Sequence, residues 1–364
     1  MLAFCCFVPG QTFTDEHTHI YPFLFEFVRV NEKTMTTFSD PPRFIITPAV
    51  LRVVAAIDEF KGGWAALGDL PPERLDELEQ RAVCRAVAAG IRLGGGAISD
   101  QQVESVLAGE VASARFGVTD NIAGYAKVLR LLTTSFASIP FTEHHLKQFH
   151  RVLATPGGGG NRGEFRHEDG GRIAGQMRQL LAWAAGAQEE EQLHPLLVVA
   201  AFVLRFQAIC PFAEDNERLA RLLALLLLLK SDYGFLRYHP LPAVIEEQRA
   251  GYDQWLQEGI ARLRGDNVIA EPWLLSFFTV LLRQTDHVRA AVIRARRQTS
   301  RHGLEQQIID HVRSQGQATN KLIQTATGAN RNTIKVRLGK LVAEGDLVRH
   351  GSGKGSRYTL AARG

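Results

Sequence analysis

The stretch "FQAICPFAEDNERLARLL", residues 206–223, decides the fold of this 364-residue chain. An apolar segment ends at Ile209, a polar turn follows, and the next segment carries Arg218 and Arg221. A polar turn that leads into a helix presents unpaired backbone N–H groups, which favour an anion such as phosphate. Two arginines three residues apart lie on one helix face and can bind further phosphate oxygens. The stretch therefore predicts two helices joined by an anion-binding loop.

The composition is typical of a soluble globular protein with two or three domains, because 45% of the residues are hydrophobic and 22% are charged. The apolar run Leu222–Leu229 is far shorter than the roughly 20 residues that cross a bilayer, so we expect no membrane contact. The first ten residues lack the pattern of a secretion signal. The cysteines show neither disulfide nor metal spacing, which predicts a reducing, cytoplasmic location. They are Cys5, Cys6, Cys84 and Cys210.

The periodicity of apolar residues divides the chain into four parts. Residues 1–40 show no clear period and form an N-terminal arm. Residues 41–115 are helical, and residues 116–295 form the main helical domain, which is interrupted by a Gly-rich loop with a short hairpin at 155–175. We therefore expect a mostly α protein with a small separate domain at 301–364.

The last part changes character and is basic. Residues 301–364 hold 11 Lys and Arg against 4 Asp and Glu, a balance of +7, so the remaining residues sum to −3 (31 minus 34). Three short helical patterns and a hairpin predict a winged helix, preceded by a basic linker at 294–303. Its third helix would turn a basic face outward to contact DNA, although docking to a protein or autoregulation fits the same pattern. The expected DNA-binding residues are Arg331, Asn332, Lys335 and Arg337.

The opening stretch resembles the signature of the Fic (Fido) family, His-Pro-Phe-x-[Asp/Glu]-Gly-Asn-Gly-Arg-x-x-Arg. The resemblance implies a Fic domain over residues 116–295, and a transfer of AMP from ATP to a hydroxyl side chain of a target protein. It implies that Glu214 binds Mg²⁺ and that Asn216, Arg218 and Arg221 bind the nucleotide. "NRGEFR", residues 161–166, is similar to the flap that docks the target. The flap residues are Gly163, Glu164, Phe165 and Arg166.

Three positions depart from the family signature. Cys210 stands where the family has the histidine that acts as general base, and an imidazole suits that task at neutral pH better than a thiol does. Asp215 and Glu217 replace the two glycines of the phosphate cradle. They add bulk and two negative charges where a polyphosphate would lie. The resemblance thus implies a protein adenylyltransferase whose activity is weak or absent.

A second departure concerns the family's inhibitory helix, whose glutamate pairs with the second signature arginine. The corresponding segment is residues 88–100, where Gly90 and Gly94 take the serine and glutamate positions. The run Gly94–Gly96 also disfavours a helix. The inhibitory residue is therefore missing together with the base and the cradle.

Several roles stay open at this point. Cys210 fits an inert thiol, a reactive thiolate used covalently, or a working base. Glu214 fits a solvated carboxylate as well as a metal ligand, and the two arginines could pair with Asp215 or Glu217 instead of an anion. The main alternative is a non-enzymatic regulator, with the helical body as a binding scaffold or homodimer and the C-terminal domain on DNA. Outside the signature, His144, His145 and His150 are expected to be surface or core residues, and His194 is expected to be structural.

Overall fold

The computed structural model describes residues 41–67, 69–110, 118–153, 162–166, 171–189 and 193–361. Side chains are not described at 118–120, 189, 298–302 and 354. The predicted arm and most of the predicted hairpin lie outside these ranges. The chain divides into unit 1, residues 1–289, and unit 2, residues 290–364. Among the described helices, none is both long and apolar enough to cross a membrane.

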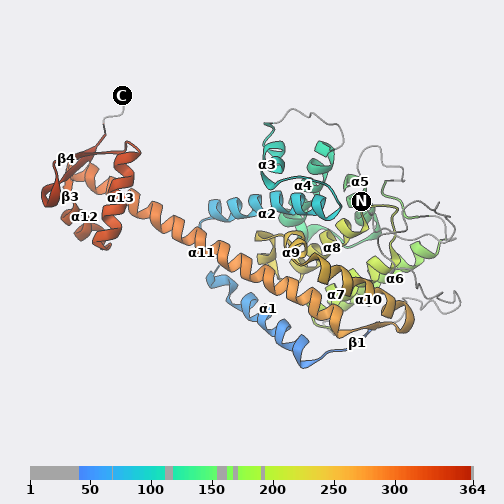
Figure 1. Cartoon of the computed structure of the whole chain (residues 1–364). Helices are drawn as coiled ribbons and strands as arrows, with labels where there is room; N and C mark the ends of the chain where they lie inside the picture. Colours follow the sequence, from blue (N-terminus) through green and yellow to red (C-terminus); the bar gives the residue numbers. More distant parts are fainter. Residues whose placement is uncertain are drawn as a thin grey trace, which may run out of the picture. The chain divides into compact units, whose positions relative to one another are not determined.

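Unit 1 is mostly α, as predicted, and is built around α7 (Pro195–Ile209) and α8 (Asn216–Lys230). Nearly every residue of both helices is buried, because α7 packs against α6, α8 and α10 (Figure 1). A helix that is apolar on all sides belongs in the core of a larger domain. His194 caps α7 by accepting a hydrogen bond from the Leu196 N–H at 3.3 Å, so it is structural, as expected.

The other helices of unit 1 surround this pair (Figure 1). Helix α1 begins at Pro48, and the Thr47 hydroxyl accepts a hydrogen bond from the Val50 N–H. The glycine run at 94–96 ends a helix, as its composition predicts. The elements are α1 (Pro48–Leu67), α2 (Pro72–Leu93), α3 (Asp100–Leu107), α4 (Val118–Ser135), η2 (Phe136–Ser138), α5 (Glu143–Leu153), α6 (Arg172–Glu189), η3 (Gly234–Tyr238), α9 (Leu241–Glu247) and α10 (Arg249–Asp266).

A short parallel sheet joins two distant parts of unit 1. Strand β1 (Arg43–Phe44) pairs with β2 (Val268–Ile269), in the register Arg43 to Val268 and Phe44 to Ile269. Two-residue strands carry no periodic signal, so the sequence did not reveal this pair. It fixes the chain just before α1 to the end of α10.

The predicted linker at 294–303 is helical. It lies within α11 (Glu271–Gln315), a helix of 45 residues that contains the boundary between the two units. The helix can continue through this segment because Arg and Ala both favour helices and the segment contains no proline. The first of the three predicted C-terminal helices is therefore the end of α11.

Unit 2 continues with α12 (Asn320–Thr327), α13 (Arg331–Ala343) and a three-stranded antiparallel sheet. The sheet has the order β3 (Ala318–Thr319), β5 (Arg357–Leu360), β4 (Leu347–His350), with Leu347 opposite Leu360. A buried apolar stripe on α13 forms part of a core that also includes Ile308 and Val312 of α11. This arrangement is compatible with a winged helix. The stripe consists of Ile334, Leu338 and Leu341.

Candidate functional site

The signature loop, residues 210–215, joins the end of α7 to the start of α8. Cys210 and Asp215 both have left-handed backbone conformations, with φ of 48° and 59°. Asn216 fixes the loop between them, because its Oδ1 accepts from the Phe212 N–H at 3.0 Å and its Nδ2 donates to the Phe212 carbonyl at 2.7 Å. Asn216 and Phe212 are buried. The Asn216 side chain therefore holds the loop shape, while its backbone N–H stays at the helix N-terminus.

Asp215 keeps the backbone conformation that a glycine would adopt at this position. A left-handed residue costs little for glycine, and aspartate is among the few others that tolerate it. Asp215 is also the N-cap residue of α8, but its side chain makes no capping hydrogen bond. Asp215 thus has a backbone conformation that a glycine would adopt without cost.

Each acidic replacement pairs with one of the two signature arginines. The Asp215 Oδ1 lies 3.4 Å from Nη1 of Arg218, and the Glu217 Oε2 lies 3.6 Å from Nη1 of Arg221. Both arginines are only 8% exposed. Of the alternatives that the sequence left open, the structure shows the internal ion pairs. The two carboxylates are thus paired with the same guanidinium groups that the sequence predicted to bind an anion.

Helix α4 provides a second set of contacts to the same arginines. Asn121 Oδ1 accepts a hydrogen bond from Arg218 Nη1 at 2.7 Å, and the Arg218 guanidinium lies over the Tyr125 ring at 5.4 Å from its centroid. Burial raises the pKa of Tyr125 although both arginines act to lower it. A Cβ on Gly90 would overlap the Tyr125 ring, so glycine at this position of α2 makes room for tyrosine.

The end of α2 lies beside the signature, where the resemblance places the inhibitory glutamate. A Cβ on Gly94 would lie 3.9 Å from Nη2 of Arg218, and the Leu93 carbonyl accepts a hydrogen bond from Arg249 at 3.1 Å. The helix stops there, as the glycine run predicts. Asp215 and Glu217 of the signature, rather than a residue of α2, supply the carboxylates at the arginines.

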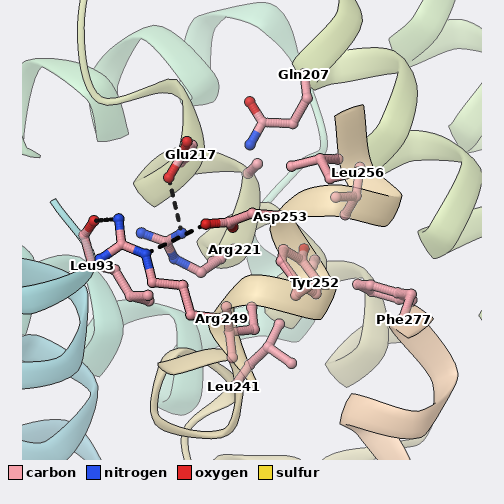
Figure 2. Close-up of a pocket in the computed structure, with 14 residues that line it drawn as sticks. Leu93, Gln207, Glu217, Arg221, Leu241, Arg249, Tyr252, Asp253, Leu256 and Phe277 are labelled. Carbon is pink, nitrogen blue, oxygen red and sulfur yellow. Dashed lines mark hydrogen bonds and ion pairs between the residues drawn. The ribbon is translucent and has the colours of Figure 1, made fainter. Parts of the chain in front are cut away.

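A small pocket, partly open to solvent, borders Arg221. Its polar side carries two ion pairs, Glu217 with Arg221 and Asp253 with Arg249, the latter at 3.4 Å (Figure 2). Its other side is apolar and includes Leu256 and Phe277 (Figure 2). Two cations face two anions, so these pairs give the polar side no net charge.

The positions of the predicted base and metal ligand differ in exposure. Cys210 is buried at the end of α7, where its backbone N–H bonds to the Phe206 carbonyl. Its sulfur is not a free thiol in this structure, whereas the roles that the sequence left open for Cys210 all require one. Glu214 is exposed on the turn. Among described residues no group of three or more His, Cys, Asp or Glu is placed to hold a metal, and a single carboxylate binds Mg²⁺ only together with other ligands such as phosphates.

The described part of the predicted flap, residues 162–166, crosses the signature loop, and we call it the flap strap. Arg166 donates its N–H to the Pro211 carbonyl at 2.9 Å and its Nε–H to the Cys210 carbonyl at 2.9 Å. Phe165 is buried against Phe212, with ring centroids 5.1 Å apart. The strap thus brings predicted flap residues onto the predicted anion loop.

Two further flap residues face α5. Glu164 pairs with Lys147 at 3.2 Å, and Gly163 donates its N–H to Nδ1 of His150 at 3.0 Å. Burial lowers the pKa of His150, which favours a neutral ring. The sequence left open whether His150 is a surface or a core residue, and the structure shows that it is in the core. Its two polar contacts could not be predicted from the sequence.

Sequence reasoning missed the contacts of Asn121, Tyr125 and Arg249. Asn121 and Tyr125 are four residues apart on α4 and therefore share a face, which is the only sequence signal for their pairing. Arg249 is the first residue of α10, and nothing in its surroundings in the sequence marks it.

One predicted DNA-binding residue does not face outward. Arg331, Asn332 and Lys335 are exposed on α13, but the Arg337 side chain is 15% exposed. Its Nη1 lies 3.3 Å from Oε1 of Glu305 on α11. Arg337 precedes the buried Leu338, so its guanidinium lies at the edge of the core, where a carboxylate holds it.

Comparisons with known proteins agree with this geometry. Residues 140–228 match the Fic/DOC family, and residues 292–356 match a family described as bacterial protein of unknown function (DUF977). A search of curated proteins found no match. The chain therefore carries a Fic-type domain that includes α5, the flap strap, the signature loop and most of α8.

Solved structures of Fic proteins share the fold. A Fic family protein from Desulfovibrio desulfuricans G20 is 21% identical, with a TM-score of 0.59 over 89% of this chain and 99% of that one. A Fic domain containing signaling protein from Bacteroides thetaiotaomicron VPI-5482 is 18% identical, with a TM-score of 0.55 over 65% and 96%. Fic-1 from C. elegans is 20% identical, with a TM-score of 0.50 over 68% and 70%. At these identities the likeness shows the fold alone.

Proposed function

We propose that unit 1 is related to protein adenylyltransferases but transfers AMP weakly or not at all. The observation that carries this proposal is the pairing of Asp215 with Arg218 and of Glu217 with Arg221, at 3.4 and 3.6 Å. Arg218 and Asp215 are both largely buried, so their pair is only weakly screened by solvent, whereas the Glu217 side chain that pairs with Arg221 is 42% exposed. A polyphosphate would have to displace two carboxylates, one at the end of the signature loop and one in the first turn of α8. The residues present therefore do not fit the triphosphate of ATP.

The electrostatic balance around the signature supports the same conclusion. Arg249 beside the pocket is paired with Asp253, so it does not compensate for the neutralised arginines. The family's base position holds Cys210, so no imidazole is present there to accept a proton from the attacking hydroxyl at neutral pH. Without a bound nucleotide and without imidazole at this position, neither substrate of the transfer is activated.

Isothermal titration calorimetry of the full-length protein with ATP and Mg²⁺ tests this proposal. We expect weak or undetectable heat, because the arginines have carboxylate partners. The matched control is a titration after Arg221→Ala, which should leave the weak signal unchanged. A dissociation constant in the low micromolar range for the wild type, lost in Arg221→Ala, would show that the site binds nucleotide and would refute the proposal.

We infer a second function for unit 2, which is DNA binding through a winged helix. The exposed Arg331, Asn332 and Lys335 near the start of α13, together with the +7 balance of residues 301–364, favour this inference. Lys and Arg that neutralise phosphates bind DNA and release counterions, so affinity falls with salt. Arg337 is excluded from the proposed surface because it pairs with Glu305.

The salt dependence of fluorescence anisotropy on a DNA duplex tests this second function. Changing both Arg331 and Lys335 to Ala should weaken binding and reduce the slope of log K against log salt by about 2, if each contacts one phosphate. Arg313→Ala is the control, because Arg313 is exposed on α11 and away from α13 in the sequence. No binding by the wild-type protein at low salt would refute DNA binding and favour docking to a protein.

A further inference from the structure

His150 of α5 lies between the flap strap and the signature loop and makes a polar contact with each. Its Nδ1 accepts from the Gly163 N–H at 3.0 Å, and its Nε2 lies 3.2 Å from the Glu214 carbonyl oxygen. A carbonyl can only accept, so Nε2 must carry the proton. Both contacts together require one neutral tautomer, with a single proton on Nε2.

The imidazole also packs flat against the loop. Its ring lies 3.9 Å from the Phe212 ring, centroid to centroid, at an interplanar angle of 10°. Both side chains are buried, and Phe165 of the strap contacts the same Phe212 ring. The side chain of His150, which belongs to α5, therefore contacts both the flap strap and the signature loop.

The flap strap is attached to the signature loop at two points. One attachment is direct, and the other is made through the side chain of His150 on α5. At Arg166 the strap bonds directly to Pro211 and Cys210. At Gly163 the strap reaches the loop through His150. Gly163 has a φ of 76°, and a Cβ there would lie 2.8 Å from the Lys147 carbonyl, so the backbone runs close against α5 and fits only glycine.

We propose that His150 is a positioning residue that couples the Gly163 end of the flap strap to the Glu214 end of the signature loop. Arg166 fixes the other end, so the two anchors together set the strap's position along the loop. The coupling rests on contacts within the chain and not on the proposed loss of AMP transfer. A protein that binds nucleotide well could have this coupling, and a protein that binds none could lack it.

The state of the ring can be measured in the wild-type protein without any substitution. In ¹⁵N NMR spectra of the imidazole, His150 should show a protonated Nε2 and an unprotonated Nδ1 at neutral pH. The Gly163 N–H should be protected from hydrogen exchange, as should the Arg166 N–H, which bonds to Pro211. A proton on Nδ1 of His150 would overturn the proposal, because the Gly163 N–H would then have no acceptor there.

Three substitutions separate the two contacts. His150→Phe keeps a flat ring on Phe212 but removes both contacts, so exchange at Gly163 should rise about tenfold for a hydrogen bond of ordinary net strength. In His150→Asn, Oδ1 lies near the former Nδ1 and should preserve protection at Gly163. In His150→Gln, the amide lies near the former Nε2 and should preserve only the contact to Glu214. The Arg166 N–H is the internal control, and it should keep its protection in all three variants.

Two results would contradict the coupling in folded variants. One is wild-type protection of Gly163 in His150→Phe, which would mean that His150 only fills space in the core. The other is equal loss of protection at Gly163 and Arg166, which would mean that the whole strap depends on packing. If a variant does not fold, the tautomer of the wild-type ring still decides the proposal.

Discussion

Replacing the two acidic residues of the cradle by glycine should restore anion binding. The double change Asp215→Gly and Glu217→Gly removes the carboxylates that lie 3.4 and 3.6 Å from Arg218 and Arg221. Asp215 already has a φ of 59°, so glycine enters a backbone conformation that it favours. We expect the fold to be kept and both arginines to become available.

The size of the gain follows from the charges. A phosphate oxygen about 4 Å from a carboxylate is repelled by about 1 kcal/mol in water and about 4 kcal/mol in a partly buried site. Taking the smaller figure for each carboxylate gives about 2 kcal/mol, which corresponds to about a 30-fold tighter dissociation constant. The arginines also no longer have to leave their internal partners, so about 30-fold is a lower bound.

Calorimetry with ATP and Mg²⁺ measures the gain, and two sets of variants control it. Asp232→Gly makes the same substitution at the other end of α8, where φ is 65°, and should leave affinity unchanged. The pair Asp215→Asn and Glu217→Gln removes charge while keeping size, so it separates repulsion from bulk. If the double glycine variant folds and binds no better than the wild type, the carboxylates are not the obstacle and our reasoning fails.

Three further predictions concern stability, measured by denaturant unfolding or by hydrogen exchange of the full-length protein. Gly90→Ala should cost about 1–3 kcal/mol because its Cβ meets the Tyr125 ring, whereas a helical glycine with open space around it, Gly186, should tolerate alanine. Asn216→Ala should cost about 1–3 kcal/mol because two buried backbone groups of the loop lose their partner, and a cost near zero would contradict its role in the loop. Glu305→Ala should lower protection in the core of unit 2 by about 1–3 kcal/mol, because two basic side chains of α13 lose their carboxylate; unchanged protection would argue against that contact.

The sequence predicted the main features of unit 1 because they depend on local signals. The glycine run at 94–96 predicted the end of α2, and the residue types at 206–223 predicted the helix–loop–helix. The residue types of the signature left two kinds of partner open for its arginines, namely its own acidic residues or an external anion. The sequence alone does not decide between them. The choice depends on distances of a few ångströms, which residue types do not contain.

Other features depend on contacts between distant segments. The pairing of β1 with β2 joins residues 43–44 to 268–269, and His150 contacts both Gly163 and Glu214. No periodic pattern marks such contacts. The basic composition of the predicted linker at 294–303 also did not reveal that the segment is part of a continuous helix.

The most direct test of the central claim, an intact Fic-type fold whose transfer chemistry is lost at three positions, is a rescue experiment read by intact mass. The triple variant Cys210→His, Asp215→Gly and Glu217→Gly should modify itself or a lysate protein with a nucleotide-sized mass gain when ATP and Mg²⁺ are present. Adding Arg221→Ala should abolish the gain, and the wild type should show little. Equal labelling of the wild type and the triple variant would contradict the claim, because the native site would then be active with Cys210 and both carboxylates in place.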